Sequence, residues 1–168
     1  LIFPPKVAPI QVVIMPVAQH LDDNVILTVN KMAEQLRSSG YRVRVDDRDL
    51  RPGAKHYDWE IKGVPIRIEL GPRDLKSGQF VMTLRTGGKD SHDSNLLQEI
   101  VSQAISDIES ELRQRSNEHM EELVVKFPGI TESHNGWKLN SPLEDGKVYE
   151  FAFDGNDSDA EILEKATE

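Results

Sequence analysis

The chain has 168 residues, the size of one ordinary domain or of one domain with an appendage. It lacks cysteine, which excludes disulfide bonds, thiolate zinc sites and cysteine nucleophiles, and it has no apolar run of bilayer length, so we expect no membrane partner. The net charge of −9 hides an asymmetry, because residues 41–89 hold eleven basic and seven acidic side chains, whereas residues 90–168 hold six and nineteen.

A phosphate backbone responds to local charge rather than to the total. The middle third of the chain is therefore the candidate nucleic-acid surface. A solvated surface of mixed charge remains the alternative.

Residues 10–45 predict a β-α-β unit. Residues 10–17 form a short apolar run, typical of a strand buried on both faces. Apolar residues then recur at helical spacing from Val25 to Leu36, and Gly40 is placed to end that helix in a left-handed conformation. Residues 41–46 alternate as a second strand, so a parallel pair with a crossover helix is expected.

The next segments indicate a short helix over residues 52–61 and two strands over 64–70 and 79–84. The residues between these strands have turn-forming sequence, so we expect a hairpin with a longer loop. Residues 86–89 are expected to form a flexible exit from the second strand.

From Ser94 to about Arg115 an apolar stripe predicts a long amphipathic helix that continues past His119. Residues 126–147 are predicted to be a linker or loop. A strand over 147–153, an acidic turn and a helix from Ala160 follow.

We therefore expect an α/β domain over residues 1–117, with a mixed sheet covered by helices, and an acidic α+β appendage over residues 118–168. Because Leu1 is not Met and no signal peptide follows, the sequence is expected to come from the middle of a longer protein.

Motifs of common enzyme sites are missing from the sequence. It contains no HExxH, GxSxG or GxxxxGK[ST] pattern, and the five histidines are scattered. Asp46, Asp47 and Asp49 form an acidic cluster, but arginines are interleaved with them, so charge pairing is favoured over metal binding. We expect no catalytic residue and no metal ligand in this chain.

Residues 51–75 alternate aromatic, basic and acidic side chains, and four charged residues of this region and its flank can converge at one edge of the sheet: Glu60, Arg67, Asp74 and Lys89. Carboxylates accept from the amine and ring N–H of guanine, Arg and Lys donate to its O6 and N7, and aromatic rings stack on unpaired bases. The pattern therefore fits the reading of an RNA loop, and no DNA partner is expected. A salt-bridge network around a hairpin is the alternative.

Several ordered motifs resemble the anticodon-binding domain of prolyl-tRNA synthetases of the archaeal/eukaryotic type. They span residues 4–89 and comprise Pro4-Pro5-Lys6-Val7-Ala8-Pro9, Asp46-Asp47-Arg48, Pro52-Gly53-Ala54-Lys55, Asp58-Trp59-Glu60-Ile61-Lys62-Gly63-Val64-Pro65 and Gly71-Pro72-Arg73-Asp74-Leu75. The resemblance implies a five-stranded mixed sheet flanked by about three helices, as in class II synthetases.

The resemblance also implies that the domain reads the two guanines of the tRNA-Pro anticodon, with Glu60, Arg67, Asp74 and Lys89 at the matching positions. We add four neighbouring candidate contacts: Trp59, Lys62, Arg73 and Arg85. The stretch that ends at Lys89 is one residue shorter and less charged than in many members of the family.

The C-terminal sequence departs from the family more strongly. Residues 148–155 resemble the segment that enters the family's zinc-binding domain, but Asp154 and Asp159 stand where a cysteine pair is usual. Zinc structural sites use thiolate or imidazole ligands, so we expect no zinc here. A weak hard-cation site formed by Asp154, Asp157 and Asp159 is less favoured than a solvated acidic turn.

For the full-length enzyme the resemblance implies ATP- and Mg-dependent ligation of proline to tRNA-Pro in the cytoplasm, and a homodimer formed through a catalytic domain that this chain lacks. The chain itself is expected to need no cofactor and to be inactive alone. The alternative is a synthetase-like accessory or dimerisation module that does not read tRNA.

Overall fold

The computed structural model describes residues 2–134, 136–151 and 157–167. These fall into two compact units, Leu1–Arg113 and Gln114–Glu168. In the part of the chain that is described, no helix has the length and apolar character needed to cross a bilayer.

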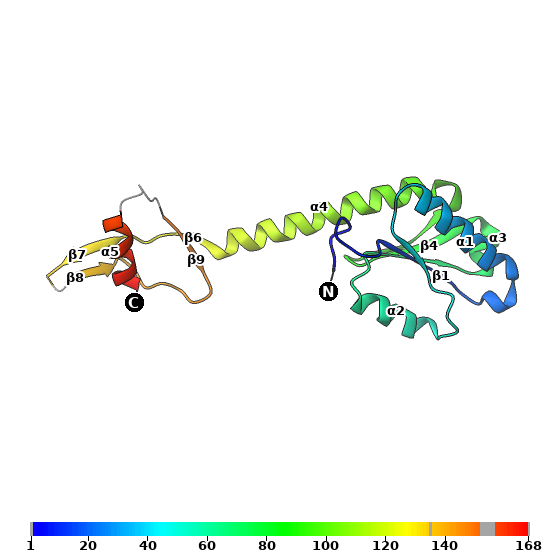
Figure 1. The fold of residues 1–168 in the computed structure, drawn as a ribbon, viewed down its shortest axis with the longest axis horizontal. Helices are drawn as coiled ribbons and strands as arrows, with labels where there is room; N and C mark the ends of the chain where they lie inside the picture. The colour runs from blue at the N-terminus through cyan, green and yellow to red at the C-terminus, as the bar shows by residue number, and fades with distance from the viewer. Residues whose placement is uncertain (1, 135, 152–156, 168) are drawn as a thin grey trace. The chain divides into compact units, whose positions relative to one another are not determined.

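A mixed sheet of five strands forms the centre of the first unit (Figure 1). Its strands are β1 (Val12–Pro16), β2 (Val43–Val45), β3 (Ile66–Leu70), β4 (Gln79–Leu84) and β5 (Lys89–Asp93). They lie in the order β2-β1-β3-β4-β5, with β1 parallel to both of its neighbours and β4 antiparallel to both of its own. The predicted β-α-β unit and mixed five-stranded sheet are confirmed.

Helices cover both faces of this sheet (Figure 1). They are α1 (Asp23–Ser38), α2 (Pro52–Ile61), α3 (Pro72–Ser77) and the first part of α4 (Leu97–Leu123), with 3-10 turns at Gln19–Leu21 and Ser94–Leu96. The Asp22 carboxylate accepts from the backbone N–H of Asn24 and so begins α1. Gly40 follows the end of α1 with φ of 88°, the left-handed conformation expected of it.

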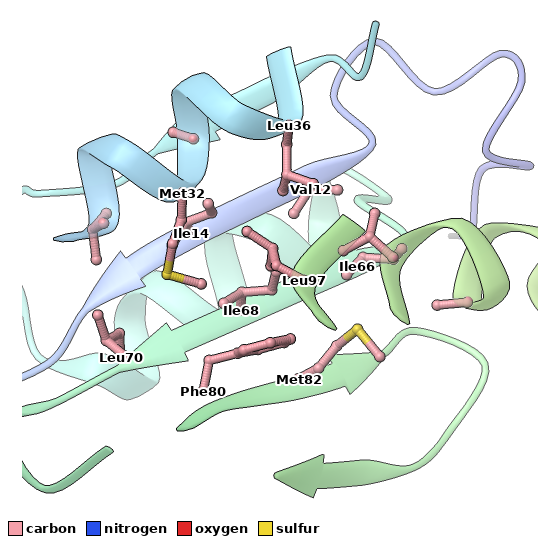
Figure 2. Close-up of a cluster of buried hydrophobic side chains, with 14 of the residues drawn as sticks. Val12, Ile14, Met32, Leu36, Ile66, Ile68, Leu70, Phe80, Met82 and Leu97 are labelled. Atoms are coloured by element: carbon pink, nitrogen blue, oxygen red, sulfur yellow. The ribbon is translucent and has the colours of Figure 1, made fainter. Parts of the chain in front are cut away.

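The main core lies between the sheet and the helices α1 and α4. The inward-facing residues of β3, Ile66, Ile68 and Leu70, are fully buried because side chains alternate along a strand. Figure 2 shows them among Met32 and Leu36 of α1, Leu97 of α4 and the neighbouring strands. The apolar stripe of α4 supplies Leu97, Val101, Ala104 and Ile108 to this core.

A smaller core lies on the opposite face of the sheet. Val13 and Met15 of β1 pack there with Trp59 of α2 and with Val64. The outward-facing residues of β3 lie next to this core and are only partly buried. This second face therefore presents polar side chains of β3, β4 and β5 beside α2.

Two predictions for residues 64–93 were wrong. The expected loop between β3 and β4 contains α3, which ends at Gly78 with φ of 67°. The expected flexible exit at residues 86–89 leads directly into β5, which begins at Lys89. β5 consists of Lys, Asp, Ser and His at the exposed edge of the sheet, and such a segment lacks the apolar alternation by which strands are recognised.

The second unit contains two small sheets. β6 (Val124–Lys126) pairs in parallel with β9 (Val148–Glu150), and β7 (Ile130–Ser133) pairs antiparallel with β8 (Gly136–Leu139). The predicted linker over 126–147 is thus wrong, because it contains a hairpin, whereas the strand predicted near residue 148 is confirmed.

The C-terminal helix, α5 (Asp157–Thr167), begins three residues before the predicted start. The expectation for Asp154 falls on a residue outside those described. Asp157 and Asp159 belong to α5, so the acidic turn expected there is replaced by helix at these two positions.

Candidate nucleic-acid interface

A cluster of charged side chains gathers around Glu69 on the second face of the sheet. Its Oε1 lies 3.2 Å from Arg67 Nε and its Oε2 lies 3.5 Å from Lys89 Nζ. Arg67 in turn holds Glu60, with 3.6 Å between Nη1 and Oε1. The structure therefore brings together three of the four predicted base-reading residues, Glu60, Arg67 and Lys89. We call these three residues with Glu69 and His56 the Glu69 cluster.

Strand register places the cluster. Arg67 of β3 lies opposite Thr83 of β4, and Thr83 lies opposite Lys89 of β5, so the three side chains form a row on one face. Glu69 lies two residues after Arg67 and therefore on the same face. Glu60 comes from helix α2, which covers this face of the sheet.

The residues of the cluster differ in how firmly they are held. The side chains of Arg67 and Glu69 are 14% and 13% exposed, whereas those of Glu60 and Lys89 are 47% and 57% exposed. Exposed ion pairs contribute about 0–1 kcal/mol and exchange easily for other partners. Arg67 is thus a fixed donor, and Glu60 and Lys89 can turn to a ligand.

His56 was missed by sequence reasoning. Its Nε2 lies 2.7 Å from Glu69 Oε1, a distance at which a protonated imidazole would form an ion pair with the carboxylate. Burial lowers the pKa of His56 below its ordinary 6.5, and the charges of Arg67 and Lys89 lower it further, against the opposite effect of Glu69. The net effect on this pKa favours the neutral imidazole.

Asp74, the fourth predicted reader, lies beyond the C-terminal end of β3. Its Oδ2 accepts from the backbone N–H of Gly71 at 2.9 Å and so caps α3. Among the described residues its carboxylate bonds within its own turn and not with the Glu69 cluster. Arg73 is exposed on the same short helix.

The flanking candidates Trp59 and Lys62 have structural contacts. Trp59 is 7% exposed, and its indole N–H donates to Asp46 Oδ2 at 2.7 Å. Lys62 Nζ lies 4.4 Å from the centre of the Trp59 ring, a cation–π distance. With its ring packed in the smaller core, Trp59 offers no free face on which a base could stack.

Asp46 accepts hydrogen bonds from both Arg48 and Trp59. Arg48 donates to Asp46 through Nε and Nη2, both at 2.8 Å, and to Asp58 at 2.9 Å, so the predicted charge pairing is confirmed for Asp46. Burial raises the pKa of Asp46, but the hydrogen bonds from Arg48 and Trp59 and the charge of Arg48 outweigh it and lower the pKa to about 2. Lys55 Nζ donates to the carbonyl of the same residue.

Two polar atoms beside Arg67, Thr83 Oγ1 and Arg85 Nε, are buried and have no hydrogen-bond partner in the part of the chain that is described. Their residues line a hollow of about 50 Å³ together with Glu60 and Arg67. The backbone N–H of Arg85 donates to the carbonyl of Pro65 at 2.9 Å, which fixes the position of this residue after β4.

A metal site is not part of this arrangement. Among the described residues, no group of three or more His, Asp or Glu side chains is placed to hold an ion. The Glu69 cluster mixes donors and acceptors on an open face, which suits the edges and phosphates of a polar ligand.

Comparison with known proteins places this geometry in context. A family model described as "Anticodon binding domain" matches residues 11–115. The proline–tRNA ligase of Thermococcus kodakarensis is 41% identical over 135 residues, which cover 79% of this chain and 28% of that protein. Those of Methanoregula boonei and Pyrobaculum islandicum are 40% and 39% identical, covering 88% and 92% of this chain. The chain spans less than a third of the length of these curated relatives, 28–31%.

Proposed function

The chain belongs to the anticodon-binding domain family, and from that premise we propose that it reads the anticodon of tRNA-Pro within a proline–tRNA ligase. The observation that carries this proposal is the placement of Arg67. Its guanidinium is held by Glu69 and lies beside the half-exposed Glu60 on an open sheet face.

The chemistry of the cluster suits guanine. Glu60 accepts from the ring N–H and the exocyclic amine, and Arg67 and Lys89 donate to O6 or N7. In the free protein Glu60 and Arg67 are 3.6 Å apart, a weak pair that a base edge replaces at little cost. Since the ring N–H of guanine is accessible only when the base is unpaired, the proposed ligand is a loop of RNA rather than a duplex.

Asp74 and Arg73 are assigned to a neighbouring nucleotide of the same loop, because they lie at the other end of β3. Lys62 and Arg85 flank the cluster and complete the proposed RNA surface. Trp59 supports this surface from the core by bonding Asp46 and by preceding Glu60 in α2.

The activity of the whole enzyme is part of the same proposal. Its other parts would activate proline with ATP and Mg, would form the homodimer and would act in the cytoplasm. The second unit is proposed to descend from the family's zinc-binding domain without its cysteines. DNA and membranes are not proposed as partners. These assignments rest on the resemblance of the motifs and on the names of the relatives.

Fluorescence anisotropy with a labelled tRNA-Pro anticodon stem-loop tests anticodon reading. We expect Arg67→Ala and Glu60→Ala to weaken binding by about 1–3 kcal/mol, the size of a good base contact. Lys31→Ala is the matched control, because Lys31 is exposed on α1, which covers the opposite face. A second loop carries adenine in place of the two guanines.

Equal affinity of the unmodified chain for the two loops would overturn base reading. Absence of binding to either loop, together with a dimer in light scattering, would favour the accessory or dimerisation module instead.

A further inference from the structure

The hollow beside Arg67 contains two buried polar atoms that have no hydrogen-bond partner among the described residues. We propose that Thr83 and Arg85 complete a subsite for the edge of one guanine, in which both face the 6-carbonyl side while Glu60 takes the N1 and N2 side. This inference rests on the proposed function, because it assigns two further specificity residues to the same RNA surface.

The first step concerns the cost of leaving these atoms unpaired. Thr83 Oγ1 and Arg85 Nε are buried and have no hydrogen-bond partner among the described residues. A buried polar group without a partner is destabilising, so folded proteins satisfy nearly all such groups with protein, water or ligand partners. Two such atoms in one hollow are explained if binding supplies their partner.

The second step concerns position. Thr83 lies between Arg67 and Lys89 in the row across β3, β4 and β5. Neighbouring strands are about 4.8 Å apart, so a base edge that reaches both cations passes directly over Thr83. Arg85 lies two residues after Thr83 and is fixed by its backbone bond to Pro65.

The third step concerns the chemistry of the partner. Arg67 and Arg85 only donate, Glu60 only accepts, and the hydroxyl of Thr83 does both. A base edge that bonds with all of these side chains must present an acceptor next to donors. Guanine does so with its O6, its N1–H and its N2 amine. The hollow of about 50 Å³ is too small for a base ring, so it receives the edge and the ring remains above the sheet.

Binding of the stem-loop to Thr83→Val tests the inference, because valine keeps the shape of threonine and removes only the hydroxyl. We expect binding to weaken about three- to tenfold, while the midpoint of urea unfolding stays the same or rises, since an unsatisfied hydroxyl is lost. Thr28→Val on α1 is the matched control and should leave binding unchanged. Arg85→Lys keeps the charge but removes Nε, and should weaken binding about tenfold.

A modified loop identifies the contacted atom. 2-Aminopurine lacks both the 6-carbonyl and the N1–H of guanine and keeps the amine, so Thr83→Val and Arg85→Lys should have no further effect on a loop that carries it at the contacted position. Inosine lacks the amine and keeps the carbonyl, so both variants should still weaken its binding.

Different outcomes separate the inference from the function on which it rests. If the unmodified chain prefers the guanine loop but Thr83→Val and Arg85→Lys bind it as well as the parent, the hollow holds only water and the inference is overturned. A marked loss of stability in Thr83→Val would also overturn it, because the hydroxyl would then have a partner within the protein. If the unmodified chain shows no preference for guanine, the proposed function itself fails.

Discussion

Arg67 and Glu69 lie on the same face of β3, two residues apart, with 3.2 Å between Arg67 Nε and Glu69 Oε1. The other oxygen of Glu69 lies 3.5 Å from Lys89 Nζ. A carboxylate at this place lowers the attraction of the surface for phosphates, but it fixes the direction in which the guanidinium donates. We therefore expect Glu69 to act as a positioning residue that favours selectivity over affinity.

Glu69→Gln is expected to reduce selectivity without abolishing binding. Loss of the negative charge should raise affinity for the adenine-substituted loop and lower the preference for guanine several-fold. It should also steepen the dependence of binding on KCl, because the freed cations meet phosphates. Anisotropy titrations of both loops at several KCl concentrations measure this. Glu34→Gln on α1 is the control, and an undiminished preference for guanine in Glu69→Gln would contradict the role.

The imidazole of His56 is expected to titrate below 6.5, its ordinary pKa, and Arg67→Gln should raise its pKa by removing a nearby positive charge. Since the pKa of the folded state is lowered, neutral His56 contributes stability above about pH 6.5, and this contribution falls as the pH drops below that value. An NMR titration of the imidazole protons measures the shift. A pKa above 6.5 would show that Glu69 dominates this site instead.

The sequence predicted the elements whose spacing of apolar residues matches the face that they bury. The continuous apolar run of β1 and the helical spacing of α1 and α4 indicated their elements correctly, because these segments bury a full face or a stripe. β5 was not predicted, because an exposed edge strand needs no apolar side chains. Helix α3 was not predicted, because its six residues have turn-forming sequence. Its start depends on the Asp74 cap.

The site was predictable only in part for a related reason. Glu60 and Arg67 were singled out by residue type and by resemblance to a family. Thr83 lies beside Arg67 because of the register between β3 and β4, which pairs residues about fifteen positions apart and cannot be read from either segment alone. The burial of Trp59 likewise depends on Asp46, thirteen residues away, which accepts from its indole.

Asp46→Asn is expected to destabilise the first unit by about 2 kcal/mol. The pKa of Asp46 in the folded protein is about 2, against 3.8 for an unperturbed carboxyl, and this difference corresponds to about 2 kcal/mol of stability. The contribution is fully present above about pH 4 and is lost as the pH falls through 2. Urea unfolding between pH 2 and 7 measures it. The variant should lack this part of the pH dependence, and an unchanged acid profile would contradict the assignment.

Ile108→Ala and Met120→Ala separate the buried stripe of α4 from its exposed part. Ile108 is fully buried in the main core, whereas Met120 is 51% exposed on the same helix. Truncation of a buried isoleucine costs about 2–5 kcal/mol, and an exposed position usually changes stability by less than about 0.5 kcal/mol. Hydrogen exchange of the β1 and β3 amides reports on the first unit alone, since both strands lie at the centre of its sheet. Faster exchange in Ile108→Ala but not in Met120→Ala is expected, because Ile108 belongs to the core cluster that contains side chains of both strands. Equal protection in the two variants would contradict that packing.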